Sequence, residues 1–137
     1  MADSGKRWTV RDRDGNVTNC SYDKDADVLY ISFAPGEKAT AAVELNDNIL
    51  LRFNRAEKRA VGLTLMDFSV MAQLTRLGPR SFPLSGLQEL EPEWQEMVIE
   101  IITQPPVNEI LELFTFMPSP TESVPITAIK PPIPVAV

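Results

Sequence analysis

The segment SYDKDADVLYISF, residues 21–33, joins three aspartates at alternate positions to an alternating apolar run. In an extended chain, successive side chains point to opposite sides, so Leu29, Ile31 and Phe33 share one side of this run. The residues between them face the other side. The segment therefore predicts a β-strand whose polar start carries the aspartates.

The next two segments repeat this alternation. Residues 41–53, AAVELNDNILLRF, contain two alternating runs separated by an Asn-Asp-Asn turn, and residues 59–68, RAVGLTLMDF, contain a third. Short polar turns between such runs are typical of an antiparallel meander with one apolar face. In these segments the apolar face is expected to contain Val43, Leu45, Ile49, Leu51, Phe53, Val61, Leu63 and Leu65. This face needs a covering layer.

The covering layer is expected to be helical. Residues 91–106, EPEWQEMVIEIITQPP, place apolar side chains at the spacing of one helix face, with a proline at the start and a proline pair at the end. The members of this face are Trp94, Met97, Val98, Ile101 and Ile102. The pattern predicts a helix that packs on the sheet.

A second, shorter helix is expected to begin at Ser69 and to end before Gly78-Pro79. Its apolar face would contain Val70, Met71, Leu74 and Leu77. Further on, NEILELFTFM and SVPITAIK flank a Pro-Ser-Pro turn and are rich in residues that favour strands, so they predict a late strand pair. Residues 131–137, PPIPVAV, are interpreted as an extended tail that packs on a second subunit.

The predicted fold class is α+β, an antiparallel β-meander with one face covered by helix, followed by a C-terminal helix and a late strand pair. Residues 1–20 are expected to form an N-terminal hairpin or arm, because an Asp-Gly-Asn turn separates two apolar runs. Residues 21–78 would form the meander with its short helix. Residues 79–137 would form an acidic, proline-rich helix–strand region and tail on the same core.

Charge divides the chain at the same boundary. Through Gly78 the sequence contains eleven Lys and Arg against eleven Asp and Glu, whereas from Pro79 it contains two basic residues against eight glutamates. The net charge of −6 therefore belongs to the second region. Because nucleic-acid affinity depends on neutralising phosphates, this balance argues against a nucleic-acid ligand. No leader or membrane anchor is recognisable, so a cytoplasmic location without membrane contact is expected.

The three aspartates resemble the ligand positions of a calcium loop only in part. Counted from Asp23, the spacing of Asp25 and Asp27 suits such a loop, but Val28 stands where glycine is needed and Ala34 where glutamate is needed. We interpret the three as turn residues that bind nearby backbone amides. No metal or cofactor is expected.

Catalytic chemistry has few candidates. The chain has no histidine, and this excludes the common Ser-His and Cys-His pairs. Asp27 paired with Glu44 or Asp67 could transfer protons if a cleft raised the pKa of one carboxyl. These three are the weak candidates for a site, and the chain is not expected to be an enzyme.

Residues 21–70 carry a family resemblance. They read YDKDADVLYISF, VELNDNILLRFN and RAVGLTLMDFS, and are similar to a small bacterial domain-of-unknown-function family with the pattern Y-D-x-x-x-D-x-L-Y-I and, later, V-G-I-E-I-L-D-A-S. The matching positions are Tyr22, Asp23, Asp27, Leu29, Tyr30, Ile31, Asp47, Val61, Gly62, Leu65, Asp67 and Ser69. The resemblance implies a compact meander followed by a helix, in a domain that associates with a second copy of itself. It implies no known activity. This chain departs from the pattern at residues 51–59, LRFNRAEKR, which are basic.

Three functions remain open. The leading expectation is a non-catalytic interaction or regulatory module that forms a homodimer or small homo-oligomer through a spare sheet face or edge. The second is an antitoxin-like partner whose acidic region covers a basic protein. The third is an enzyme or small-ligand binder that uses Asp27, Glu44 or Asp67.

Overall fold

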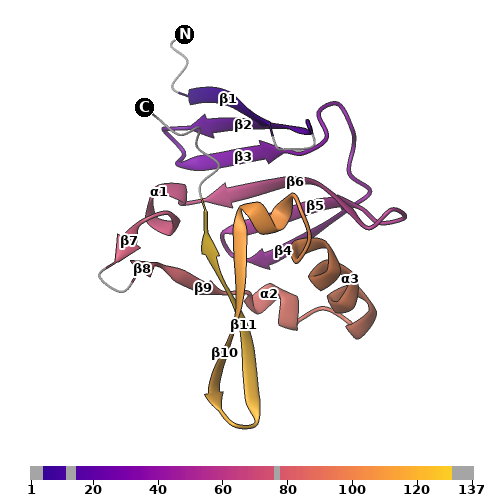
Figure 1. The fold of residues 1–137 in the computed structure, drawn as a ribbon, viewed down its shortest axis with the longest axis vertical. Coiled ribbons are helices and arrows are strands. Elements are labelled where there is room, and N and C mark those ends of the chain that lie inside the picture. Colours follow the sequence, from indigo (N-terminus) through magenta and orange to yellow (C-terminus); the bar gives the residue numbers. More distant parts are fainter. Residues whose placement is uncertain (1–4, 12–14, 76–77, 131–137) are drawn as a thin grey trace.

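The alternating segments form the strands of one large sheet. The computed structural model describes residues 5–11, 15–75 and 78–130. The sheet contains β1 (Gly5–Arg11), β2 (Val17–Asp23), β3 (Val28–Ser32), β4 (Ala41–Asn46), β5 (Ile49–Asn54) and β6 (Arg59–Met66) (Figure 1). All of its neighbouring strands pair antiparallel. We call it the main sheet.

The strand order of the main sheet is β1-β2-β3-β6-β5-β4. Strands β1 to β3 form one three-stranded meander and β4 to β6 form another, and the two meet where β3 pairs with β6. The chain after β3 therefore crosses from the centre of the sheet to its far edge. The predicted α+β class with an antiparallel meander is confirmed, and the β3–β6 pairing is the feature that the sequence order does not show.

The N-terminal segment forms a hairpin within this sheet. β1 pairs with β2 from Gly5 opposite Asp23 to Arg11 opposite Val17. β2 spans the predicted boundary between residues 20 and 21, and its other edge pairs with β3. The hairpin is consequently continuous with the rest of the sheet.

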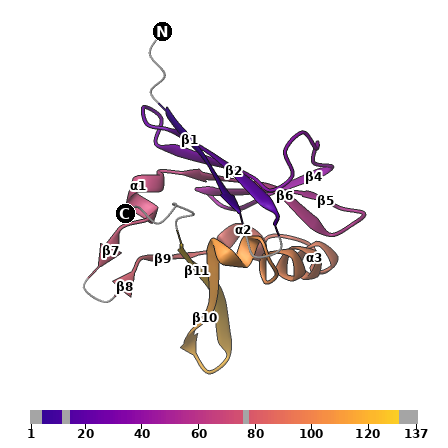
Figure 2. The same cartoon turned by 45° about the horizontal axis from the view of Figure 1, so that its top comes forward.

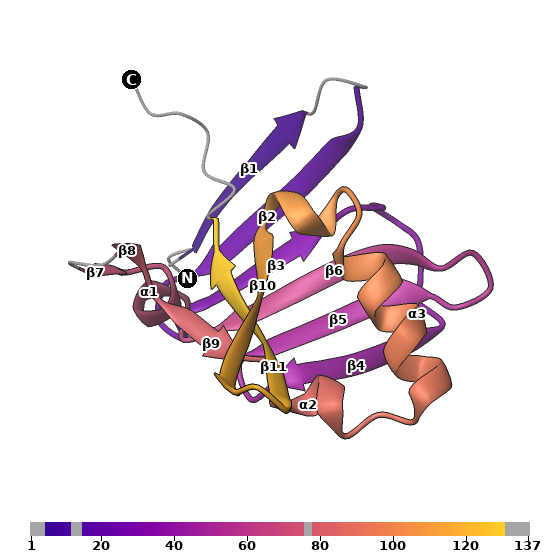
Figure 3. The ribbon, with the colours of Figure 1, turned by 60° about the horizontal axis from the view of Figure 1, so that its bottom comes forward.

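The covering layer comes from the later part of the chain. It contains α2 (Ser85–Gln88), α3 (Pro92–Ile102), the 3-10 turn η1 (Val107–Glu109), and a second sheet, ordered β10-β11-β9, of β9 (Ser81–Pro83), β10 (Leu111–Ser119) and β11 (Glu122–Ile129). Figures 2 and 3 show these elements on one side of the main sheet. The predicted long helix and late strand pair are confirmed, whereas the tail, 131–137, lies outside the described residues. None of the helices in the described ranges has the length and apolar character needed to cross a membrane.

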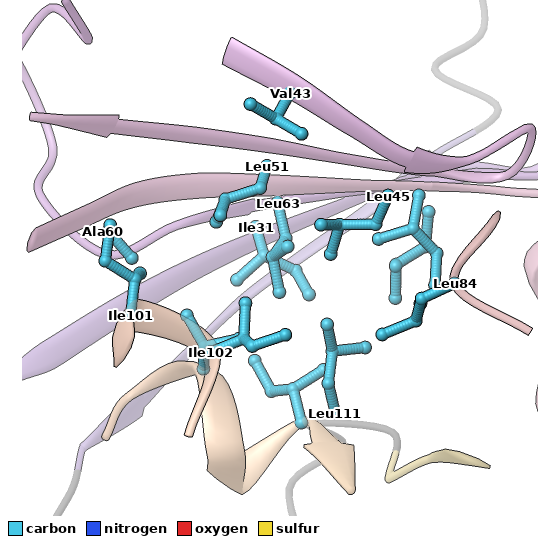
Figure 4. Packing of buried hydrophobic residues seen from close by; sticks show 14 of the residues in the cluster. Ile31, Val43, Leu45, Leu51, Ala60, Leu63, Leu84, Ile101, Ile102 and Leu111 are labelled. Atoms are coloured by element: carbon cyan, nitrogen blue, oxygen red, sulfur yellow. The ribbon is translucent and has the colours of Figure 1, made fainter. Parts of the chain in front are cut away.

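Hydrophobic side chains from both layers form one core (Figure 4). Leu29, Ile31 and Leu63 of the main sheet are fully buried, and Val98 and Ile102 of α3 belong to the same cluster. Burying a side chain of this size stabilises the fold by roughly 1.5–3 kcal/mol. The apolar face predicted from the alternation is therefore the face that builds the core.

One predicted core position is wrong. Phe53 pairs with Ala60 while Arg52 pairs with Gly62, so β6 bulges at Val61. A bulge adds one residue on one strand and shifts the alternation of side chains. Ala60 therefore joins the core cluster, and Val61, although buried, lies outside it.

The predicted short helix is also shorter than expected. α1 spans Phe68–Met71, and Leu74 belongs to β7 (Leu74–Thr75), which pairs with β8 (Gly78–Pro79). The Gly-Pro pair thus provides a strand partner, and this geometry competes with continuation of the helix. Of the expected apolar face, Leu77 lies outside the described residues.

Candidate functional site

A cluster of polar side chains joins the end of β2, the start of β3 and the start of α1. The Tyr22 hydroxyl donates a hydrogen bond to Asp27 Oδ1 at 2.6 Å. The Ser69 hydroxyl donates to Asp27 Oδ2 at 2.7 Å, and the Ser69 backbone N–H donates to Oδ1 at 3.0 Å. We call Tyr22, Asp27 and Ser69 the Asp27 latch, because one carboxylate holds three segments of chain together.

The backbone places Asp27 for this role. Its φ of 56° lies in the left-handed region, which aspartate tolerates better than most residues. Its carbonyl accepts a hydrogen bond from the Phe68 N–H at 3.0 Å, so both its main chain and its side chain bind the first turn of α1. The Tyr22 ring also meets the Phe68 ring edge to face, with centroids 5.8 Å apart. The latch therefore acts as a cap for α1 that is supplied from the turn between β2 and β3.

The hydrogen bonds determine the charge state of the latch. Donation from the Tyr22 hydroxyl, followed by donation from Ser69, lowers the pKa of Asp27 below its ordinary value of 3.8. The same Tyr22–Asp27 hydrogen bond raises the pKa of Tyr22. Asp27 is thus an ionised carboxylate whose oxygens are already engaged, and such a group is a poor proton acceptor near neutral pH.

Asp67 lies beside the latch but has a different partner. It also has a left-handed backbone, with φ of 54°. Its Oδ2 accepts a hydrogen bond from Asn48 Nδ2 at 3.0 Å, and the same amide group donates to the Met66 carbonyl at 3.1 Å. Asn48 thereby ties the β4–β5 turn to the residues that precede α1. Asp27 and Asp67 lie at one end of the sheet, and each makes a structural contact.

The remaining aspartates of the opening segment behave as turn residues. Asp23 Oδ1 accepts hydrogen bonds from the backbone N–H groups of Asp25 and Ala26, both at 3.1 Å. This geometry confirms the predicted role of Asp23 in binding nearby amides. Within ranges 5–11, 15–75 and 78–130, no three His, Cys, Asp or Glu side chains converge in a way that could hold a metal ion.

Glu44 lies apart from the other two candidates. It is exposed on β4, the far edge strand, whereas Asp27 lies in the turn directly before β3. Two strands, β6 and β5, separate β3 from β4. Beside Glu44 there is an open hollow of about 420 Å³ that Asp47, Ser85 and Glu89 also line. The structure therefore brings Asp27 and Asp67 to one end of the sheet and leaves Glu44 elsewhere.

Sequence reasoning from spacing alone did not find the partners of Asp27. Ser69 lies 42 positions from Asp27, and only the return of the chain through β6 brings the two together. Tyr22 and Ser69 were both among the positions that match the family pattern, and that pattern was the available signal.

The fold and the latch define the class of this chain: an antiparallel α+β domain in which one carboxylate ties β2 to α1. Residues 19–69 match the DUF2283 family, which is described as a protein of unknown function. This segment extends from β2 to α1 and contains all three latch residues, but it covers 51 of the 137 residues of the chain. Neither the curated proteins nor the solved structures contain a match to this chain.

Proposed function

We propose that this chain is a non-catalytic, self-associating interaction module of the bacterial cytoplasm. The observation that carries the proposal is the β10–β11 hairpin, which projects away from the main sheet (Figure 1). Near its tip the hairpin exposes three large hydrophobic side chains, Phe114, Phe116 and Met117. We call this hairpin the arm. The engaged state of Asp27 and its distance along the sheet from Glu44 favour a role without catalysis.

One face of the arm is apolar. Phe114 lies opposite Ile126, and Phe116 lies opposite Val124, so the four side chains share a face. Phe114 is 44% exposed and Phe116 is 54% exposed. Exposed aromatic groups clustered on one surface are typical of protein interfaces. The arm therefore offers a hydrophobic surface that a partner would cover.

The edges of the two sheets indicate which partner fits. An unpaired strand edge binds other strands unless charges, proline or a neighbouring element protects it. The β1 edge carries Lys6, Arg7 and Arg11. The β4 edge is covered by α2, where a Cβ on Gly86 would lie 1.9 Å from the Glu44 carbonyl oxygen.

The second sheet differs at its two edges. The β9 edge ends in Pro83, whose carbonyl already accepts a hydrogen bond from Asn46. The β10 edge is nine residues long, LELFTFMPS, and its single charged residue is Glu112. Among the sheet edges in the described residues, β10 is thus the longest, and its protection is limited to Glu112 near its start and Pro118 near its end. A second copy of β10 is the occupant that fits, because antiparallel pairing about a two-fold axis joins the two edges and places the two aromatic faces side by side on one surface of the joined sheet.

The test is the oligomeric state in solution. Native mass spectrometry and light scattering should give twice the chain mass of 15.3 kDa for the unmodified protein. Phe116→Lys should shift the equilibrium to the monomer, since it places a charge in the proposed contact. Ile99→Lys is the matched control, because Ile99 on α3 is also exposed, at 39%, but lies away from the arm. A monomer at all concentrations, or a dimer that Phe116→Lys leaves intact, would contradict the proposal.

A second candidate, an acidic partner of a basic protein, has one supporting observation. Glu93 and Glu96 are exposed on α3, whereas Glu100 pairs with Lys58 at 3.5 Å. These two carboxylates form no ion pair within the described residues, and a pair of this kind on one helix suits a basic surface. Co-purification of a basic protein from the native host that is lost as salt rises, and lost in Glu93→Gln/Glu96→Gln, would support this candidate.

A further inference from the structure

Within the described residues, one face of the main sheet is uncovered. The helices and the second sheet lie on its other side (Figure 2). Because side chains alternate along strands, the uncovered face carries the residues between the core positions. Tyr30, between the buried Leu29 and Ile31, is 45% exposed there. This face is available to a ligand.

The strand register places a row of polar residues across that face. Thr9 lies opposite Asn19, Asn19 opposite Ser32, and Ser32 opposite Gly62, which in turn lies opposite Arg52. The row thus runs from β1 through β2, β3 and β6 to β5. An open hollow of about 560 Å³ follows it, and no carboxylate lines this hollow in the described residues.

Arg52 lies over Gly62 at one end of the row. A Cβ on Gly62 would lie 2.8 Å from Arg52 Nη2 and 3.4 Å from Arg52 Cζ, so the guanidinium occupies the space that the missing side chain leaves. The contact with Gly62 holds the planar guanidinium of Arg52 against the surface of the sheet. The glycine is therefore what permits the arginine to lie here.

The guanidinium has no acidic partner among the residues that the structure describes. Arg52 forms no ion pair within the described residues, and its Nε–H is buried without a hydrogen-bond acceptor. A buried donor without an acceptor is costly, and an arginine fork binds carboxylate or phosphate oxygens through two parallel hydrogen bonds. By contrast, Arg59 on the same sheet has its guanidinium engaged by Glu37 and Glu57. Arg52 is the arginine of the row that is left for an external oxyanion.

We propose that the uncovered face binds a small organic oxyanion, with its phosphate or carboxylate group on Arg52 and its polar body along Ser32 and Asn19. Ser32 and Asn19 supply a hydroxyl and an amide that suit the hydroxyl groups of such a molecule. Arg7 also lines the hollow but stands on β1, four strands from β5. At about 4.8 Å per strand the two backbones lie roughly 19 Å apart, so one oxyanion is held by Arg52 alone.

The experiment uses the side-chain Nε–H resonances of arginine in the full-length, isotope-labelled protein. Inorganic phosphate and sodium acetate are titrated separately, with sodium chloride at equal ionic strength as the reference. We expect a saturable shift of the Arg52 signal in the millimolar range with phosphate, acetate or both, and none with chloride. The two probes distinguish a phosphate ligand from a carboxylate ligand.

Three variants sharpen the result. Arg52→Gln should abolish saturable binding, measured on the backbone signals of Ser32 and Asn19, and Ser32→Ala should weaken it several-fold. Gly62→Ala keeps every charge but displaces the guanidinium, so it should weaken binding at least tenfold. Arg55→Gln is the matched control, because Arg55 is exposed and stacks on Trp94 at 4.6 Å, and it should bind normally. Shifts that do not saturate, that chloride reproduces, or that persist in Arg52→Gln would overturn the proposal.

Discussion

Replacement of Asp27 by Asn tests the latch most directly. Asparagine tolerates the left-handed backbone of this position as aspartate does, so the substitution changes the side chain without straining the chain. It removes the charge and converts one oxygen to an NH2 group. The carboxylate that accepts from the Tyr22 hydroxyl, the Ser69 hydroxyl and the Ser69 N–H therefore loses at least one bond, and the other bonds weaken.

The expected loss follows from these bonds. A hydrogen bond to a charged group contributes about 1.5–3 kcal/mol when buried, and the latch is half-exposed, so we expect a loss of about 1–2 kcal/mol in the free energy of unfolding. For a chain of this length the corresponding decrease in Tm is about 3–7 °C. The matched control is Asp25→Asn, in the same turn but exposed, which should change stability by less than about 0.5 kcal/mol.

The measurement is urea unfolding at pH 7, repeated at lower pH. Because the folded pKa of Asp27 lies below its ordinary value of 3.8, its ionised form stabilises the fold fully above that value. The stability difference between the unmodified protein and Asp27→Asn should therefore persist at pH 5. It should disappear as the pH falls through the folded pKa. Equal unfolding midpoints for Asp27→Asn and Asp25→Asn at pH 7 would refute the latch as a stabilising contact.

Three further predictions test other parts of the fold. Leu29→Asp and Leu51→Asp each place a carboxylate at a fully buried position. Each should therefore lower the free energy of unfolding by more than about 4 kcal/mol, measured in thermal or urea unfolding. Tyr30→Ser, on the uncovered face, is the control and should not cause a loss of this size. Gly86→Ala should destabilise the fold by about 1–3 kcal/mol, because its Cβ would lie 1.9 Å from the Glu44 carbonyl oxygen. This loss should exceed the gain that alanine gives as a helix former. Ser85→Ala is the control, and a Gly86→Ala protein more stable than the unmodified one would contradict the packing of α2 on β4. Burial raises the pKa of the Cys20 thiol to about 11. Ellman's reagent at pH 8 should therefore react with the unfolded protein only. Rapid reaction of the folded protein would contradict the burial of Cys20.

The strands were predictable because alternation depends on local geometry. Apolar residues such as Leu29, Ile31 and Leu51 occupy alternate positions of their strands, and the sheet buries the face that they share. The bulge at Val61 was not predictable, since it depends on how β5 and β6 pair. The prediction of a longer α1 was wrong for a similar reason. Leu74 continues the helical spacing, but its pairing with Pro79 in the strand pair β7–β8 determines its structure.

The latch was only partly predictable. The aspartates at 23, 25 and 27 look equivalent in the sequence, but the structure gives them different roles: Asp23 closes the turn, Asp25 is exposed, and Asp27 binds α1. Their difference arises from contacts with Tyr22 and Ser69. Spacing cannot reveal a partner 42 residues away, so the distinction required the fold.

The segment that matches DUF2283, residues 19–69, depends on the rest of the chain for its core. Within residues 19–69, Leu45, Leu51 and Leu63 are fully buried, and their core cluster includes Leu84 and Leu111 from the later region. Without that region the apolar face of β3 to β6 would meet water, and this is costly at about 25 cal/mol per Å². The acidic region therefore completes the fold with its buried side chains. The same region then places the arm beyond the core, so one stretch of chain both closes the sheet and provides the surface proposed for self-association.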